Sequence, residues 1–244
     1  MSKAKFGYKD INKSDKPKEV NKIFTSVSNR YDLMNDFMSF GLHRVWKRQF
    51  IKLCNLSSKK KVLDIACGTG DISIALYKEN KEIELTCLDP NPDMIEICKE
   101  KFINKGKVDV NYQIQGIEDF LPNKQTFDLI TVAFGFRNFT DHNKALTNIF
   151  RLLNPGGSFI IMDFKRPRGK LYSKLFEFYT LNIIPKIGKF VAKDENSYRY
   201  LGESIQTYFS PTEIKDMLDR AGFENIKIIN LLEDVATIHI GQKS

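Results

Sequence analysis

Residues 61–71 read KVLDIACGTGD, a short apolar run that leads into two closely spaced glycines. The mostly apolar residues 62–66 suit a central strand of a parallel sheet. Gly68 and Gly70 allow the tight backbone angles and the close ligand approach that a strand-to-helix turn needs. The stretch predicts a small-molecule site where this strand ends, although the glycines alone are also compatible with a purely structural turn.

A second apolar run, residues 83–88, ends in Asp89, nineteen residues after Gly70. A carboxylate at this spacing is placed to accept hydrogen bonds from both hydroxyls of a ribose. The dinucleotide pattern requires a third glycine where this chain has Ser73. The ligand is therefore expected to contain a nucleoside without being a dinucleotide.

Acidic residues flank the glycine turn on both sides. The phosphate-loop pattern requires lysine and serine or threonine after the last glycine, whereas Asp71 follows Gly70 here. Asp64 and Asp71 would repel a pyrophosphate, but they suit the ammonium and sulfonium groups of S-adenosylmethionine (SAM). SAM is the cofactor that the sequence predicts.

Alternation of apolar and helical patterns predicts one α/β domain over residues 17–244, with a mostly parallel seven-stranded sheet and helices on both faces. Residues 1–16 are lysine-rich and predict a flexible basic tail. Residues 17–54 predict a helical cap, and about 165–209 a lid or substrate insertion. The expected strands span about 61–66, 83–89, 110–115, 128–134, 157–163, 225–232 and 235–241.

Composition limits the cellular setting and the partners. The net charge of +8 favours an anionic partner, either a nucleic acid or an anionic membrane surface. The four cysteines lack paired metal-type spacing, so we expect free thiols in a reducing cytoplasm and no metal site. We find neither a signal-type apolar segment nor an apolar run long enough to span a bilayer.

The fourth expected strand delivers residues 134–140, FGFRNFT, to the same sheet edge as the glycine turn. These residues are expected to face the methyl acceptor. SAM enzymes that methylate amino groups of nucleic acids tend to carry an Asn/Asp-Pro-Pro-aromatic run at this place, which stacks a flipped base. This chain has none, which argues against a nucleic-acid substrate.

The chain resembles the ubiquinone/menaquinone biosynthesis C-methyltransferases over most of its length. The RYDLMN run at 30–35 and the FGFRN run at 134–138 are the most restrictive matches. The full set of matching stretches is 24–36, 39–47, 64–71, 133–138, 140–141, 153–157 and 198–205.

The resemblance implies a class I SAM-dependent methyltransferase (Rossmann-like) fold. It also implies methyl transfer from SAM to a ring carbon of a polyprenylated benzoquinol or naphthoquinol. By the same resemblance Thr69 and Asp89 contact SAM, Gly116 and Ile117 border the adenine, and Ala133 lies beside the donor. Gly116-Ile117 departs from the family's usual Asn/Asp-Ala, which leaves Asp119 or backbone groups as alternative adenine contacts.

Arg137 and Asn138 are the predicted catalytic residues. The acceptor carbon becomes nucleophilic when the neighbouring phenol loses its proton. The planar donors of Arg137 can hold the resulting phenolate, and Asn138 can fix the second oxygen. A structural ion pair of Arg137 with Asp141 or another carboxylate is the alternative. His43 and His142 are weaker candidates for the base, because a lone helical histidine is more often a hydrogen-bond partner.

Residues 171–185 are too apolar and aromatic for an ordinary surface helix, and lysines follow them. They predict a membrane-facing groove for the polyprenyl tail, with Phe176 and Phe178 as substrate contacts; a core helix or a dimer contact is the alternative. Tyr31 and Tyr200 are further candidates for closing over the donor or the ring.

The expected location is cytoplasmic and peripheral at the inner leaflet of the membrane, where a polyprenyl quinol resides. A homodimer or a quinone-synthesis complex is a possible assembly, and no nucleic-acid partner is expected. Two other functions remain open: a SAM-dependent methyltransferase for RNA or protein, and a non-catalytic component of a quinone-synthesis complex. Nothing in the sequence separates benzoquinol from naphthoquinol acceptors.

Overall fold

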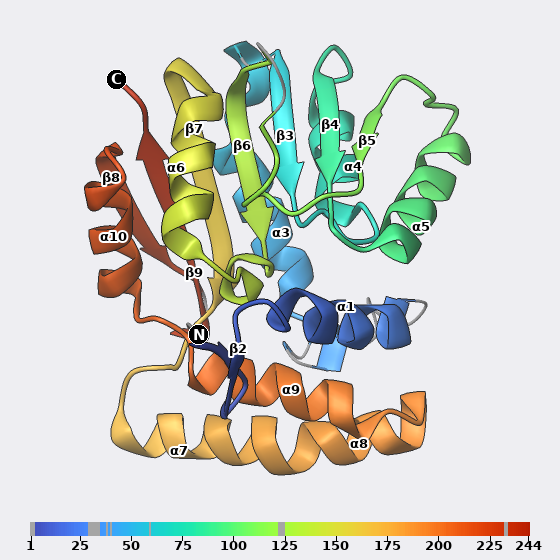
Figure 1. The fold of residues 1–244 in the computed structure, drawn as a ribbon, viewed down its shortest axis with the longest axis vertical. Helices are drawn as coiled ribbons and strands as arrows, with labels where there is room; N and C mark the ends of the chain where they lie inside the picture. Colours follow the sequence, from blue (N-terminus) through green and yellow to red (C-terminus); the bar gives the residue numbers. More distant parts are fainter. Residues whose placement is uncertain are drawn as a thin grey trace.

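The central sheet has seven strands in the order β5-β4-β3-β6-β7-β9-β8 (Figure 1). The computed structural model describes residues 3–28, 35–37, 39, 41–58, 60–121, 125–231 and 234–244. β9 runs opposite to the other six strands of this sheet, so the prediction of a mostly parallel seven-stranded sheet is confirmed. The strands are β3 (Lys61–Ile65), β4 (Glu84–Leu88), β5 (Asn111–Gln113), β6 (Phe127–Ala133), β7 (Leu153–Phe164), β8 (Glu224–Asn230) and β9 (Ala236–Gln242).

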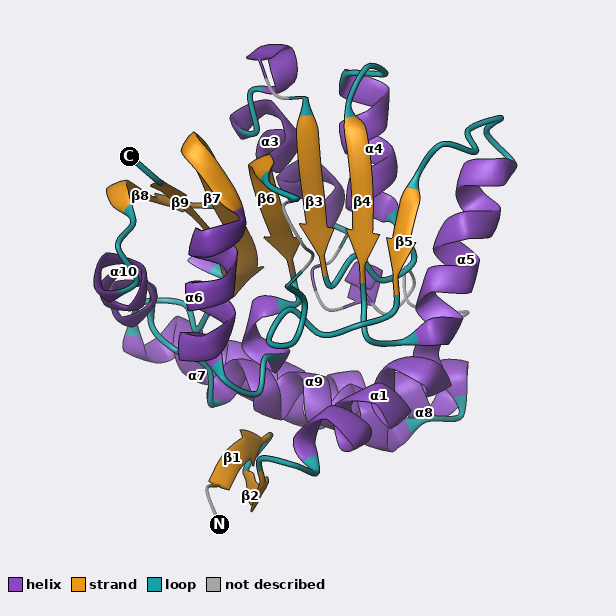
Figure 2. Ribbon diagram, turned by 45° about the horizontal axis from the view of Figure 1, so that its top comes forward, coloured by secondary structure: helices purple, strands orange, loops and turns teal. Residues whose placement is uncertain are grey.

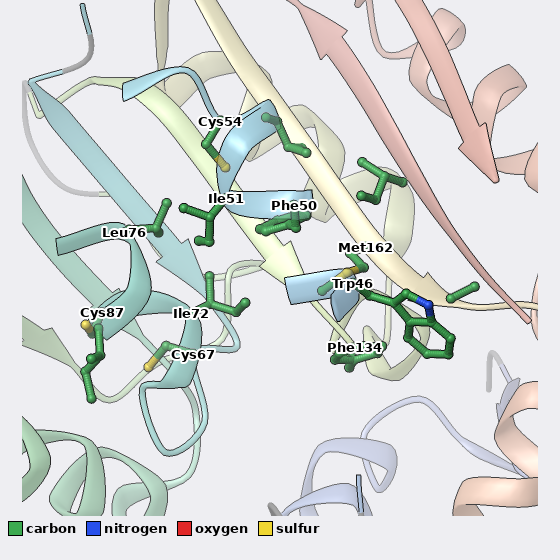
Figure 3. Packing of buried hydrophobic residues seen from close by; sticks show 14 of the residues in the cluster. Trp46, Phe50, Ile51, Cys54, Cys67, Ile72, Leu76, Cys87, Phe134 and Met162 are labelled. Carbon is green, nitrogen blue, oxygen red and sulfur yellow. The ribbon is translucent and has the colours of Figure 1, made fainter. Parts of the chain in front are cut away.

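Helices cover both faces of the sheet because each presents an apolar stripe to it. On one face, α3 (His43–Leu53) inserts Trp46 and Phe50, spaced one turn apart, toward β7 (Figure 3). The helices α4 (Asp71–Glu79) and α5 (Pro92–Ile103) complete that face. On the other face, α6 (His142–Leu152) and α10 (Pro211–Arg220) enclose a second apolar cluster.

A further helical layer lies beyond the carboxyl ends of the parallel strands (Figure 2). It consists of α1 (Lys16–Val27), α7 (Lys170–Phe178), α8 (Ile184–Ala192) and α9 (Glu195–Gln206). A π-helical segment, Tyr179–Ile183, joins α7 to α8. Ligands of parallel α/β sheets bind at this edge, so the layer forms a roof over the expected site.

The N-terminal segment, for which the lysines predict a flexible tail, forms a hairpin over residues 3–12. Strands β1 (Lys3–Phe6) and β2 (Lys9–Asn12) pair around Gly7, whose φ of +57° suits the tight turn. Phe6 stacks on Tyr200 of α9 with ring centroids 4.4 Å apart. This stacking, the bond from the Tyr8 N–H to Glu203 and the Lys13–Asp141 ion pair attach the segment to the rest of the domain.

No helix in the described part of the chain is both long and apolar enough to cross a bilayer.

Candidate active site

Two adjoining cavities open at the carboxyl edge of the sheet. The larger has a volume of about 280 Å³ and is bounded by the ends of β3, β4 and β6 and by α1. The smaller lies between α3 and the glycine turn. Ala66 and Phe134 line both cavities and form the wall between them.

That shared wall has an unusual backbone. Ala66 and Phe134 adopt left-handed conformations, with φ of +50° and +59°, directly after β3 and β6. Gly135 permits the close packing of the two loops, because a Cβ there would lie 2.5 Å from the Cβ of Ala66. Left-handed non-glycine residues cost about 1–3 kcal/mol each and gather where ligands are held.

The smaller cavity combines acidic and basic groups that fit the methionine end of SAM. Asp64 lies at its floor, where it accepts hydrogen bonds from the hydroxyls of Ser73 and Thr131. Asp71 on its rim is paired with Lys47 at 2.9 Å. The carboxylates suit an ammonium and a sulfonium, and the Lys47 ammonium suits a carboxylate. Thr69 and Ala133, which are predicted to lie at the donor, also line this cavity.

The larger cavity holds the residues predicted for the adenosine. Asp89 lies in its wall, with Gly68, Gly116 and Ile117. One Asp89 oxygen accepts from the backbone N–H of Gly68 at 2.9 Å, and the other accepts from the N–H of Asn91 at 2.8 Å. Asp89 therefore shapes the glycine turn as well as facing the cavity.

Gly70, which the sequence predicts to contact the cofactor, also has a packing role. It is not among the residues that line either cavity. With φ at +84° it begins α4, and a Cβ there would lie 2.4 Å from the sulfur of Cys98. Its small size is required for packing of the turn on α5, and its contact with the cofactor stays a prediction.

Burial makes two acidic groups of the site poor acids. Removal from water raises the pKa of Asp64 to about 7, although the Ser73 and Thr131 hydroxyls oppose this shift. Burial likewise raises the pKa of Asp89 to about 6, against the two backbone N–H groups that bond it. A cationic ligand that donates hydrogen bonds would restore both carboxylates to their charged form.

The binding of SAM is accordingly expected to release protons and to tighten as the pH rises from about 5 to about 8. The sign follows from the raised pKa values of Asp64 and Asp89: the free site is partly protonated, and the bound cation favours the carboxylates. Titration calorimetry in buffers of different ionisation enthalpy measures the number of protons released. The Asp89→Asn variant should release fewer protons than the wild type when SAM binds. Proton uptake by the wild type on SAM binding would contradict the assignment of Asp64 and Asp89 to the cofactor.

Arg137 lies in a closed ion pair beneath the site. Its Nη1 is 2.7 Å from the Asp163 carboxylate, and its Nε donates to the Ser204 hydroxyl at 3.3 Å. The two charged side chains are only 3% and 2% exposed. Arg137 is not among the residues that line either cavity. This geometry favours the alternative in which Arg137 forms a structural ion pair. Its partner is Asp163, where the sequence suggested Asp141 or another carboxylate.

Asn138, the neighbouring residue, does line the larger cavity. Its Oδ1 accepts a hydrogen bond from the Tyr200 hydroxyl at 3.0 Å. Tyr200 is buried between Asn138 and Phe6, which accounts for its raised pKa and makes it a neutral donor at ordinary pH. Tyr200 thus positions a predicted catalytic group.

The two candidate bases have other partners. The Nε2 of His43 lies 2.8 Å from an Asp36 oxygen, and the Nε2 of His142 lies 2.9 Å from the carbonyl of Phe136. Burial lowers the pKa of His142 to about 4. Neither histidine is among the residues that line the two cavities. This agrees with the sequence analysis, which made both of them weaker candidates for the base.

The aromatic residues assigned to the substrate separate in the structure. Phe176 is 6% exposed and belongs to the core, which favours the core-helix alternative for it, whereas Phe178 is 58% exposed. They are two positions apart on α7 and therefore face opposite sides of it. Tyr31 lies outside the described residues.

Sequence reasoning missed two parts of the site. Lys47 carried no signal, because lysines and arginines number 38 in this chain. Helix α1 was predicted as part of a cap, but its residues Asn21 and Phe24 line the larger cavity. The Asn91 side chain donates to Thr25 at 2.9 Å and so fastens α1 over the strand ends.

The sequence of the chain matches one protein family over almost its whole length. The family described as the ubiE/COQ5 methyltransferase family matches residues 11–243. A relative from Edwardsiella ictaluri, named ubiquinone/menaquinone biosynthesis C-methyltransferase UbiE, is 42% identical over 241 residues, which are 98% of this chain and 96% of the relative. A relative of the same name from Hydrogenovibrio crunogenus is 39% identical over 98% of this chain and 94% of its own length.

Solved structures with a similar fold are more distant in sequence. The plantazolicin methyltransferase BpumL in complex with SAH has a TM-score of 0.61 at 14% identity, over 95% of this chain and 99% of its own. PigF with SAH has a TM-score of 0.62 at 20% identity, over 91% of this chain and 62% of its own. At such identities the likeness concerns the fold alone.

Proposed function

The chain belongs to the ubiE/COQ5 methyltransferase family, and from this membership we propose that it methylates a ring carbon of a polyprenylated benzoquinol or naphthoquinol in ubiquinone or menaquinone biosynthesis. It is a SAM-dependent C-methyltransferase. The structural observation that supports SAM binding is the pair of adjoining cavities, one with Asp64, Asp71 and Lys47 and the other with Asp89.

We assign the two ends of the cofactor to these residues. Asp64 and Asp71 face the ammonium and the sulfonium, and Lys47 faces the methionine carboxylate. Asp89 accepts from the ribose hydroxyls, and Gly116 and Ile117 border the adenine. When bound, SAM supplies the electrophilic methyl group. Ala66 and Phe134, on the wall shared by the two cavities, set the place of transfer.

The chain must also favour the ionised acceptor. With a phenol pKa near 10, the phenolate at neutral pH lies roughly 4 kcal/mol above the phenol. We assign its stabilisation to Asn138, which faces the larger cavity. The Tyr200 hydroxyl donates to Oδ1 of Asn138, so the amide directs its NH₂ donors to the acceptor oxygen.

Arg137 is a positioning residue in this scheme. Its backbone N–H donates to Asp163 at 3.0 Å, and its guanidinium donates to the same carboxylate. The two bonds hold the short 3₁₀ turn Phe136–Asn138 against the end of β7. The turn in turn places the Asn138 amide at the cavity.

Removal of the Asn138 amide tests this function. Asn138→Ala is expected to lower kcat with a short-tailed quinol by about 10- to 100-fold while SAM affinity stays within a few fold, because the lost bond serves the acceptor. Tyr200→Phe, the matched variant, removes only the hydroxyl that orients the amide and should cost less. Methyl transfer from labelled SAM, resolved by mass analysis of the quinol, measures both.

Raising the pH toward the pKa of the free phenol should partly rescue Asn138→Ala, because the solvent then supplies the phenolate. Normal kcat in the folded variant would remove Asn138 from the chemistry. Wild-type protein that binds SAM but methylates neither a benzoquinol nor a naphthoquinol would overturn the proposed function.

We further infer that the outer surface of α7 and α8 associates with an anionic bilayer. These helices form the outermost part of the roof (Figure 1). Leu175, Phe178 and Phe190 are exposed by 58%, 58% and 85%. The lysines 170, 174, 186, 189 and 193 on and beside the helices are exposed as well. Apolar side chains ringed by basic ones suit the interface of an anionic membrane, where polyprenyl quinols reside.

Substitution of these three exposed residues by serine should lower affinity for vesicles of phosphatidylcholine and phosphatidylglycerol by about tenfold or more, since each loses apolar contact. The fold should persist because none belongs to the described core clusters. Flotation or sedimentation of vesicles measures the affinity.

The control replaces Ile103, Val108 and Leu121 by serine; these are also apolar and exposed, by 51%, 73% and 53%, but lie outside the roof. That variant should bind vesicles as the wild type does. Equal loss in both variants would contradict a specific membrane face. The roof variant should also raise KM for long-tailed quinols more than for a short-tailed analogue.

A further inference from the structure

Three cysteines that are far apart in the sequence meet beneath the glycine turn. Cys67 follows β3, Cys87 lies in β4 and Cys98 lies on α5, and all three are buried. Their sulfur atoms lie within 4.8 Å of one another. Figure 3 shows Cys67 and Cys87 close together, with Cys54 well apart at the end of α3. The grouping arises from the crossing of three rigid elements.

We propose that Cys67, Cys87 and Cys98 form a binding site for a soft monovalent d¹⁰ cation, Cu(I). Thiolates are the ligands that such cations prefer. With metal–sulfur bonds of about 2.3 Å, sulfurs around a three-coordinate ion stand about 4.0 Å apart, so each side chain needs to move by well under 1 Å. Each thiol gives up its proton when the ion binds.

The surroundings select against other ions. Among the described residues, the group that could hold a metal consists of these three sulfurs alone. Structural Zn²⁺ sites usually require a fourth ligand, and hard cations require oxygen ligands and water that this buried group does not offer.

The cluster has an access route through the site already described. Cys67 lines the smaller cavity, next to Thr69 and Asp71. A cation would enter there, and bound SAM would shield the cluster. Cys67 is also part of the glycine turn, since its carbonyl accepts from the N–H of Gly70 at 2.9 Å. This coupling rests on the proposed cofactor position, whereas binding of the cation does not.

Competition with bicinchoninate for Cu(I) tests the proposal on the reduced, untagged full chain under nitrogen. The wild type should withdraw one Cu(I) per chain. Cys98→Ala should bind Cu(I) at least about 100-fold more weakly, because a two-sulfur site remains. Cys54→Ala is the matched control and should match the wild type, because Cys54 is a buried free cysteine outside the cluster.

X-ray absorption on the Cu(I)-loaded wild type needs no variant and should show three sulfur neighbours. Failure of the wild type to withdraw Cu(I), fewer than three sulfurs, or equal loss in Cys54→Ala and Cys98→Ala would overturn the site. Prior addition of SAM should slow Cu(I) uptake at least about tenfold. Unchanged uptake with a three-sulfur shell would overturn only the shared access route, and with it the placement of SAM.

Discussion

Replacement of Arg137 by leucine is expected to lower the free energy of unfolding by about 3–5 kcal/mol, because it leaves Asp163 as a buried, unpaired carboxylate. The pair is almost fully enclosed, with Nη1 and Oδ1 2.7 Å apart. Its guanidinium also stacks over Phe164, 5.5 Å from the ring centroid. Urea unfolding followed by the fluorescence of Trp46, the single tryptophan, measures the loss.

The control for Arg137→Leu is Lys215→Leu, which breaks the exposed pair with Asp219 on α10. This change should lower the free energy of unfolding by less than about 1 kcal/mol. A contrary outcome for Arg137→Leu is also informative. If the free energy of unfolding of Arg137→Leu stays within about 1 kcal/mol of the wild-type value while kcat at saturating SAM falls 10²- to 10³-fold, Arg137 has the direct catalytic role that the sequence predicted.

Removal of the Asp89 carboxylate is expected to weaken SAM binding by roughly 1.5–3 kcal/mol, or about 10- to 150-fold. Asp89→Ala removes the acceptor for the ribose hydroxyls and also frees the Gly68 N–H that shapes the turn. Both effects act on the cofactor, so kcat at saturating SAM should change less than the dissociation constant. Titration calorimetry with SAM measures the difference.

Asp89→Asn separates the two contributions. Its amide oxygen can still accept from the Gly68 or Asn91 N–H groups that bond Asp89. The loss of charge should give an intermediate affinity. If folded Asp89→Ala binds SAM as tightly as the wild type does, the cofactor does not occupy the larger cavity in the proposed orientation.

Local patterns in the sequence determined the scaffold and the cofactor end of the site. Apolar runs bounded by turn residues predicted all seven strands within a few residues. That the glycine turn and Asp89 lie at the same edge of the sheet was predictable, because the carboxyl ends of parallel strands meet there. The parallel pairing of β3 with β4 and β6 places both at that edge. Periodicity and turn chemistry act within a few residues, so they can be read directly from the chain.

Only the tertiary structure decided which partner each polar or aromatic group takes. Arg137, in the turn after β6, pairs with Asp163 of the neighbouring strand β7, and Phe6 packs on Tyr200, which is 194 residues further along the chain. The assignment of Phe176 to the core and Phe178 to the surface required the position of α7 in the roof. These contacts depend on how rigid elements cross in space, which side-chain packing sets and which no spacing along the chain encodes.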